Sequence, residues 1–351
     1  MCLTGNWRSR PLTRIERTGM CIAFVRDMQN SKPPLRNDQG VQGTEPQEAQ
    51  VLDCVVIGAG PAGLTAGLYL QRFRRHIKII DAGQSRALSI PKSFNFAGFP
   101  EGVSGDELLR RMSQHLEQVH GCVTPGVVTS IEQGRPGLFS VHLARKRLLT
   151  RNVIFCTGVQ DLVPTLPGLD AVRSAGLLRH CPICDAYEFS GRTIGVLGSS
   201  EHAIREALFL KHFSAKVSLI CPPEADVSAG LAPRASEAGL DLLPGMAAWV
   251  DVNRSGNPEG PPLRLTMDDG ACHSVDVLYA ALGAPPRAGL VARLGAQLDD
   301  QGSVVTDAHC RTSVKGLYAA GDVVSALNQL AVAVGHGAIA ATAVHNALCA
   351  T

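Results

Sequence analysis

The fold class is read most directly from residues 51–63, which have the sequence VLDCVVIGAGPAG. The apolar run at the start of this stretch predicts a buried strand, and leucines at helical spacing after Gly63 predict a helix. A second apolar run, residues 77–80, predicts another strand and ends at Asp81. Strand, helix and strand in this order form a βαβ unit, and a G-x-G-x-x-G turn at its first bend is typical of dinucleotide-binding folds.

Each residue of this turn has a physical task. Gly58 permits the tight turn, Gly60 lets the backbone approach a pyrophosphate, and Gly63 lets the helix pack against the strand. Pro61 and Ala62 open the helix, whose N-terminus attracts phosphate groups. The carboxylate that follows the second strand can accept hydrogen bonds from a ribose hydroxyl group. We therefore predict that this turn binds a dinucleotide.

A second unit of the same kind begins further along the chain. Residues 193–198 predict a strand, residues 203–213 a helix, and residues 217–220 the next strand. Two such units in a chain of 351 residues suit two domains. The predicted fold is therefore α/β, with two Rossmann-like, doubly wound domains.

The composition limits the classes of partner. The chain has 33 basic and 31 acidic residues and a net charge of +2, so no nucleic-acid partner is expected. The most apolar tract, residues 330–344, contains His336 and has the spacing of a packed helix. No run reaches the roughly 18 uninterrupted apolar residues of a membrane span, so no membrane segment is expected either.

Residues 1–50 differ in composition from the rest of the chain. They contain six arginines against five acidic residues, and they lack the apolar core of a secretory signal. Our interpretation is a disordered extension, or a translation start assigned upstream of Met20 or Met28. An organelle transit peptide is the alternative, because such peptides are rich in arginine and poor in acids.

The cysteines divide into one pair and nine isolated residues. The isolated ones are interpreted as small buried apolar residues of a protein in a reducing compartment, which predicts a cytoplasmic location. Cys181 and Cys184 form a C-x-x-C pair. Because the chain has no second C-x-x-C and no well-spaced histidine pair, no metal site is expected.

The paired cysteines have the spacing of a redox-active disulfide. One thiolate can attack a partner disulfide and the other can resolve the product, and their closeness makes the second step intramolecular. The flanking residues are His180 and Asp185. A carboxylic acid beside the pair can donate a proton to a leaving thiolate, and a histidine that faces the sulfurs can lower the thiol pKa. A thioredoxin-type motif would lie on a helix after an early strand, whereas this pair precedes the second nucleotide unit.

A further signal lies near the C-terminus, in residues 316–323, which read GLYAAGDV. A predicted strand that ends in Gly321 and Asp322 places a carboxylate beside a sugar or a sugar-like chain. In flavoproteins with two dinucleotide folds, such a Gly-Asp holds the ribityl part of FAD. Together with the first glycine turn, it indicates that the first site binds FAD rather than NAD.

In their order along the chain, these motifs resemble those of the low-molecular-weight thioredoxin reductases. The resemblance covers residues 51–351 and includes four segments besides the first turn and the cysteine pair. Those segments are Asn95 to Pro100 (NFAGFP), Cys156-Thr157-Gly158, Gly321-Asp322 and Asn328-Gln329.

The resemblance implies a domain organisation and a set of cofactor-binding residues. The second domain, residues 166–283, would be inserted in an FAD domain built from residues 51–165 and 284–351. Asn95 would lie along the edge of the isoalloxazine and Gln329 would face the ring. The other implied FAD-binding residues are Asp81, Thr157, Gly158, Gly321, Asp322 and Leu330. Asp185 would be the acid of the disulfide, the protein would form a homodimer, and its partner would be a thioredoxin-like protein.

The chain departs from the family pattern where NADPH should bind. The second glycine turn reads Gly198-Ser199-Ser200, and a side chain at Ser200 would crowd a pyrophosphate. The residues 221–223, Cys-Pro-Pro, stand where the family has a basic cluster. The 2′-phosphate of NADPH needs cationic partners, so NADPH binding is doubtful.

In this departure the chain resembles a related branch that also lacks the NADPH motif, the diflavin-linked disulfide oxidoreductases. Their pattern is similar to residues 181–188, CPICDAYE, and implies that a second flavin could bind near Cys181 and Cys184, with Tyr187 stacked on it. Ferredoxin-fed flavin thioredoxin reductases are another branch without NADPH, which makes a ferredoxin-type donor an option. The predicted function is therefore an FAD-dependent disulfide oxidoreductase that acts on a dithiol or disulfide protein or small molecule.

Three alternatives remain open at the level of the sequence. The first is an NADPH-dependent thioredoxin reductase. The second is a dithiol oxidase that passes electrons to oxygen. The third is a non-catalytic, flavin-binding regulatory protein.

Overall fold

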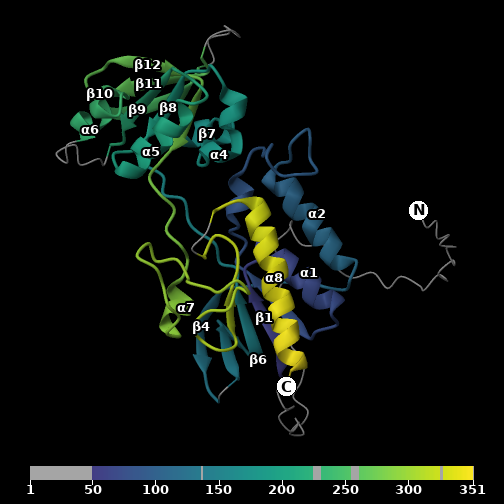
Figure 1. Ribbon diagram of the computed structural model, residues 1–351. Helices are drawn as coiled ribbons and strands as arrows, with labels where there is room; N and C mark the ends of the chain where they lie inside the picture. The colour runs from purple at the N-terminus through teal and green to yellow at the C-terminus, as the bar shows by residue number, and fades with distance from the viewer. Residues whose placement is uncertain (1–49, 136, 224–230, 254–260, 325–326, 351) are drawn as a thin grey trace, which may run out of the picture. The chain divides into compact units, whose positions relative to one another are not determined.

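A computed structural model describes residues 50–350, apart from residue 136 and the segments 224–230, 254–260 and 325–326 (Figure 1). The predicted N-terminal extension lies outside the described residues, except for Gln50. The described residues form two β-sheets with helices packed on them.

The first sheet has the strand order β3-β2-β1-β6-β5-β4, with β14 paired to β6. Strands β3, β2, β1, β6 and β14 run parallel, whereas β4, β5 and β6 form an antiparallel meander. The bounds are β1 (Leu52–Ile57), β2 (Ile77–Asp81), β3 (Val123–Pro125), β4 (Val128–Gln133), β5 (Phe139–Leu143), β6 (Lys146–Phe155) and β14 (Leu317–Ala319). The βαβ unit predicted from residues 51–81 is thus confirmed.

The helices of this part are α1 (Pro61–Arg72), the 3-10 helix η1 (Arg86–Ser89), α2 (Gly105–Glu117), α7 (Gly289–Arg293) and α8 (Leu330–Cys349). Helix α8, drawn in yellow, runs beside α1, drawn in purple (Figure 1). The close approach depends on Gly337 of α8, because a Cβ there would collide with the carbonyl oxygen of Ala62. Through this contact α8 packs directly against the first turn of α1.

Helix α8 is also the one described helix that is long and apolar enough, by composition, to cross a membrane, and 33% of its apolar window is buried. Its residues Ala333, Ala340 and Val344 belong to the core cluster that contains Leu64 of α1. Core helices of globular domains share this length and composition, so these two properties alone do not argue for a membrane span.

The second sheet has the strand order β12-β11-β10-β9-β8-β13-β7. Its bounds are β7 (Leu178–Arg179), β8 (Ile194–Leu197), β9 (Val217–Cys221), β10 (Asp241–Val252), β11 (Leu263–Met267), β12 (Cys272–Val275) and β13 (Val277–Ala280). Strands β7, β13, β8, β9 and β10 are parallel, and β10, β11 and β12 are antiparallel. The helices are α3 (Leu169–Ser174), α4 (Pro182–Asp185), the 3-10 helix η2 (Ala186–Phe189), α5 (Glu201–Leu210) and α6 (Leu231–Glu237).

The chain therefore leaves the first sheet after β6, builds the whole second sheet, and returns to the first sheet with β14. The predicted α/β class with two Rossmann-like parts is confirmed. Both sheets are mixed, however, because each carries an antiparallel extension that the sequence did not predict.

Candidate functional site

The first glycine turn has the close backbone contacts that its sequence predicts. Gly58 has a φ of +100°, and a Cβ there would collide with the carbonyl oxygen of Cys156. A Cβ on Gly63 would collide with the carbonyl oxygen of Gly58. A Cβ on Gly60 would meet the side-chain oxygen of Ser85, at 3.2 Å, but no backbone atom within 4 Å. The turn therefore offers bare backbone at Gly60 and at the N-terminus of α1.

Asp81 closes this turn at the end of β2. Its Oδ1 accepts a 2.7 Å hydrogen bond from the N–H of Ala59, and its Oδ2 accepts one of 2.7 Å from the N–H of Gly83. Each carboxylate oxygen has a further lone pair, so the bonds that hold Asp81 in place still allow it to accept from a ribose hydroxyl group.

A cavity of about 430 Å³ extends from this turn to the cysteine pair. It brings together most of the predicted site residues, namely Gly58, Gly60, Pro61, Ala62, Asp81, Thr157, Gly158, His180, Cys181, Cys184, Asp185, Gly321, Asp322, Gln329 and Leu330. Gly63 packs below the turn, and Asn95 reaches Gln329 through a hydrogen bond. Cavities of this size hold cofactors in many enzymes.

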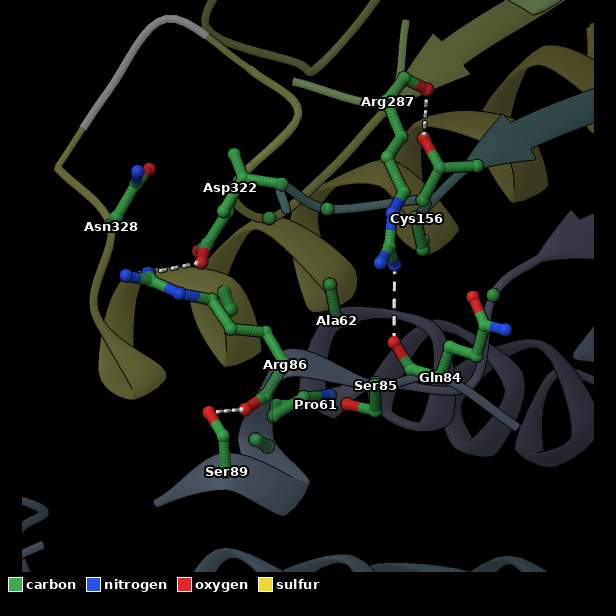
Figure 2. Close-up of a pocket in the computed structure, with 18 of the residues that line it drawn as sticks. Pro61, Ala62, Gln84, Ser85, Arg86, Ser89, Cys156, Arg287, Asp322 and Asn328 are labelled. Atoms are coloured by element: carbon green, nitrogen blue, oxygen red, sulfur yellow. Dashed lines mark hydrogen bonds and ion pairs between the residues drawn. The ribbon is translucent and has the colours of Figure 1, made fainter. Parts of the chain in front are cut away.

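One wall of the cavity carries an arginine that the sequence analysis did not identify. Arg86 donates to both oxygens of Asp161, at 2.7 to 3.0 Å. Its Nη1 donates to Asp322 Oδ2 at 3.2 Å (Figure 2). Burial raises the pKa of Asp322, and the neighbouring guanidinium of Arg86 opposes that rise. No local motif could have revealed this cluster, because its members lie 75 and 236 residues apart.

The crossover after β6 is tied to the segment that returns to the first sheet. Thr157 Oγ1 donates to the carbonyl oxygen of Arg287 at 2.8 Å, and the Arg287 side chain donates to the carbonyl oxygen of Gln84 at 3.1 Å (Figure 2). Gly158 has a φ of +64°, which a glycine adopts readily. These contacts hold the predicted residues Thr157 and Gly158 at the cavity wall.

The cysteine pair is oxidised in this structure. Cys181 and Cys184 form a disulfide, with Cys181 capping the short helix α4 and Pro182 at its first position. The N–H of Cys184 donates to the carbonyl oxygen of Cys181 at 3.0 Å, which closes the turn. Ile183, between the two cysteines, is 52% exposed. The prediction of a disulfide-forming pair is confirmed, and the disulfide lines the same cavity as the first nucleotide turn.

Gln329 links the disulfide to the first part of the chain. Its Nε2 lies 3.4 Å from Cys181 Sγ and 3.6 Å from Cys184 Sγ. Its Oε1 accepts a 3.0 Å hydrogen bond from Asn95 Nδ2. The resemblance placed Asn95 along the edge of the isoalloxazine and Gln329 facing the ring, and the structure adds that the side chain of Gln329 reaches the sulfurs while Asn95 contacts Gln329.

Asp185 lies at the end of α4 and is only 6% exposed. Tyr279 Oη donates to its Oδ1 at 2.6 Å, and Arg179 Nη1 lies 3.3 Å from its Oδ2. Burial raises the pKa of Asp185 to about 6, although Tyr279 and Arg179 both act to lower it. Such a carboxyl group can gain and lose a proton near neutral pH. Tyr279 and Arg179 were not identified from the sequence.

His180 lines the cavity, but in the described part of the chain it makes no hydrogen bond to either sulfur. Burial lowers its pKa, which favours the neutral imidazole at neutral pH. A neutral ring cannot stabilise a thiolate by charge, so its predicted influence on the thiol pKa has no electrostatic support here.

The second glycine turn lacks the bare backbone of the first. Ser200 is the N-cap of α5, and Glu201 follows it in the first helical turn, where its carboxylate pairs with Arg234. Strand β9 ends at the buried Cys221, followed by Pro222. A carboxylate at a helix N-terminus occupies the position that attracts phosphate groups in nucleotide-binding folds.

The two turns thus differ in their fit to a dinucleotide. The first provides bare backbone, a helix N-terminus, the carboxylate of Asp81 and an open cavity, which together fit FAD. A metal site has no such support: across the described ranges, no group of three or more His, Cys, Asp or Glu residues is placed so that it could hold a metal ion.

Comparisons with known proteins agree with this geometry. The model of the family described as "Pyridine nucleotide-disulphide oxidoreductase" matches residues 52–337. Thioredoxin reductase of Listeria monocytogenes is 27% identical over 299 residues, which cover 84% of this chain and 92% of that relative. Thioredoxin reductase of Bacillus subtilis is 26% identical over 310 residues, which cover 85% and 95%. The solved thioredoxin reductase of Streptococcus pyogenes superposes with a TM-score of 0.74 at 27% identity, covering 86% of this chain and 99% of that one.

Proposed function

The chain belongs to the pyridine nucleotide-disulphide oxidoreductase family, and from that premise we propose that it moves electrons between FAD and the Cys181–Cys184 disulfide without taking them from NADPH. At the coarser level it is a flavin-dependent disulfide oxidoreductase of the thioredoxin reductase type. The observation that carries the proposal is the single cavity that the disulfide and the first nucleotide turn both line.

The residues of this cavity have separate tasks in the reaction. FAD, when bound, exchanges two electrons with the disulfide. The turn at Gly60, with Asp81 and Asp322, would hold the cofactor. Reduction of the disulfide takes up two electrons and two protons when both thiols are neutral, and one proton when a thiolate remains. Asp185, with a pKa of about 6, can supply a proton to the pair.

The second glycine turn supports the proposal that the protein does not take electrons from NADPH. Ser200 places a side chain where a pyrophosphate needs bare backbone. Glu201, paired with Arg234, places its carboxylate in the first turn of the helix, and Cys221 and Pro222 stand where cations would hold a 2′-phosphate. Each of these features disfavours an anionic dinucleotide.

An anaerobic titration tests this proposal. The purified flavoprotein is mixed with stoichiometric NADPH in one cell and with dithiothreitol in another, and the flavin absorbance is followed. We expect dithiothreitol to bleach the flavin and NADPH to leave it oxidised. Rapid bleaching by NADPH would overturn the proposal and make the protein an ordinary NADPH-dependent thioredoxin reductase.

The electron donor and the partner are further parts of the proposal. The relatives are named thioredoxin reductases, which supports a thioredoxin-like disulfide protein as the partner. Reduced ferredoxin is the first donor to test. Hydrogen peroxide release from a small dithiol in air would instead identify a dithiol oxidase. A Cys184→Ser variant that matched the wild type in each thiol assay would point to a non-catalytic flavin-binding protein.

We also propose a second flavin beside the disulfide. Its support is Tyr187, which lies three residues beyond Cys184 and is 78% exposed, so its ring is open to stacking. The molar ratio of extracted flavin to protein tests this. A ratio near two supports the second flavin and a ratio near one excludes it.

The remaining proposals concern the domain boundaries, the oligomeric state and the location of the protein in the cell. The strand membership of the two sheets supports an FAD domain of residues 51–165 and 284–351 with residues 166–283 inserted. The resemblance to thioredoxin reductases supports a homodimer, which sedimentation can test. Of the isolated cysteines that the structure describes, Cys54, Cys156, Cys221 and Cys310 are buried as predicted, whereas Cys122, Cys272 and Cys349 are exposed, so the prediction of burial is wrong for these three. All seven are free thiols, which supports a reducing, cytoplasmic location.

A further inference from the structure

The amide group of Gln329 makes contact with both sulfurs of the redox pair. Gln329 is the N-cap residue of α8, and its side chain makes no capping hydrogen bond, so it is free to extend into the cavity. Nε2 lies 3.4 Å from Cys181 Sγ and 3.6 Å from Cys184 Sγ. These distances fit N–H groups that point at sulfur.

The orientation of this amide is set by a second amide. Asn95 Nδ2 donates to Gln329 Oε1 at 3.0 Å, so the oxygen of Gln329 is engaged and its NH₂ group faces the disulfide. Asn95 is itself oriented by Ser93, whose Oγ donates to Asn95 Oδ1 at 2.9 Å. Asn95 Nδ2 also lies 3.3 Å from the carbonyl oxygen of Ile183, between the two cysteines. Ser93, Asn95 and Gln329 therefore form a chain in which each side chain donates to the next, and the last NH₂ group faces the sulfurs.

The two oxidation states of the pair respond differently to this NH₂ group. A disulfide sulfur is a weak acceptor, whereas a thiolate carries a full charge and binds a donor much more strongly. When the pair is reduced, the Cys184 thiol can also donate to Gln329 Oε1, which lies 3.7 Å from its sulfur. The N-terminus of the 20-residue helix α8, one side chain away, adds a positive potential that favours the anion.

We propose that Gln329 raises the reduction potential of the Cys181–Cys184 couple by binding the thiolate of the reduced pair, and that Asn95 is the positioning residue that aims the Gln329 amide. The inference rests on the proposed function in that these sulfurs are the ones that react with the flavin. In the reaction concerned, the disulfide takes up two electrons and one proton and becomes one thiol and one thiolate. In the test below, two glutathione thiols supply the electrons and become one glutathione disulfide; of the two protons that they release, one is taken up by the pair and the other passes to the buffer.

The test measures the reduction potential of the Cys181–Cys184 couple directly. Full-length protein is equilibrated with glutathione buffers of known ratio, quenched with acid and alkylated, and the alkylation of Cys181 and Cys184 is read by mass spectrometry. In Gln329→Leu we expect the equilibrium to shift about tenfold toward the disulfide, which corresponds to a potential lower by about 30 mV. Gln329→Glu should shift it further, because its carboxylate repels the thiolate. Asn95→Ala should shift it in the same direction by less.

The controls separate this role from a structural one. Gln118→Leu alters an exposed glutamine at the end of α2 and should leave the potential unchanged. The gap between wild type and Gln329→Leu should widen as the pH rises, because more of the reduced pair is then thiolate. A change in packing alone would give a gap that does not depend on pH.

Each outcome decides the matter. A potential that stays within twofold of wild type in Gln329→Leu, or a pH-independent shift, overturns the proposal. If Gln329→Leu does not fold, Asn95→Ala gives the same test with the glutamine retained. The proposed function fails separately: in that case the potential still shifts in the variants, but dithiothreitol does not bleach the flavin.

Discussion

The phenol of Tyr279 donates a 2.6 Å hydrogen bond to Asp185 Oδ1 across 94 residues of chain. Both groups are buried, Tyr279 in the parallel strand β13 and Asp185 at the end of α4, beside the disulfide. Burial raises the pKa of Tyr279, so this phenol stays protonated and can only stabilise the charged form of the carboxyl group by donating to it. The strand thereby influences the protonation of the acid next to Cys184.

Substitution of this tyrosine should change the pH dependence of the reaction. In Tyr279→Phe the carboxylate loses a donor worth about 1.5 kcal/mol, which should raise the pKa of Asp185 by about one unit. Because the protonated acid serves disulfide reduction, we expect the alkaline limb of the pH–rate profile to move up by about one unit. The measurement is the rate of electron transfer from reduced flavin to the disulfide as a function of pH. Tyr69→Phe, at a more exposed position, is the control.

The same carboxyl group should make stability depend on pH. Its pKa is raised from 3.8 to about 6, with burial as the main cause. Between these values the folded protein binds the proton more tightly than the unfolded chain, so the free energy of unfolding falls as the pH rises through this window. We expect wild type to lose up to about 3 kcal/mol relative to Asp185→Asn between about pH 4 and pH 6. Denaturant titrations at several pH values measure it, and parallel curves for the two proteins would contradict it.

Loss of Arg86 should weaken cofactor binding. In Arg86→Met the carboxylates of Asp161 and Asp322 lose their shared cation, and an anionic cofactor then meets two uncompensated charges. A hydrogen-bonded charge in a partly buried site is worth about 1.5–3 kcal/mol, so FAD affinity should fall at least about tenfold. The measurement is the dissociation constant of FAD by flavin fluorescence. Arg110→Met, which breaks an exposed ion pair with Glu107, should leave the affinity unchanged.

Gly335 and Gly337 both lie on α8, and they provide a matched test of how this helix packs against α1. A Cβ on Gly337 of α8 would collide with the carbonyl oxygen of Ala62, whereas a Cβ on Gly335 would meet no atom within 4 Å. Gly337→Ala should therefore destabilise the protein by roughly 2 kcal/mol or more, because α8 must move away from α1. Gly335→Ala should be neutral or stabilising by up to about 1 kcal/mol through helix propensity. Urea midpoints distinguish them, and equal midpoints would refute the contact.

Local patterns were sufficient to predict the elements that carry the chemistry. Residues 51–63 predict strand, turn and helix because the apolar period and the glycine spacing are properties of neighbouring residues. The strands at residues 193–198 and 217–220 were predicted in the same way, and the structure has them as β8 and β9. The antiparallel strands β4, β11 and β12 were not predicted. They are short, and their pairing is decided by neighbours in the sheet rather than by their own residues.

The features of the redox site can be separated in the same way, into those set by neighbouring residues and those set by residues far apart in the sequence. The C-x-x-C spacing alone places Cys181 and Cys184 within reach of a disulfide, and the G-x-G-x-x-G turn alone predicts a dinucleotide, because both depend on residues a few positions apart. The contacts that adjust the chemistry lie far apart in sequence, at 94 residues for Tyr279 with Asp185, 148 for Gln329 with Cys181 and 236 for Arg86 with Asp322. Such pairs follow no spacing rule. They form only when strands and helices pack, and the tertiary structure therefore decides which groups contact the Asp185 carboxyl group, the sulfurs of the cysteine pair and the Asp322 carboxylate.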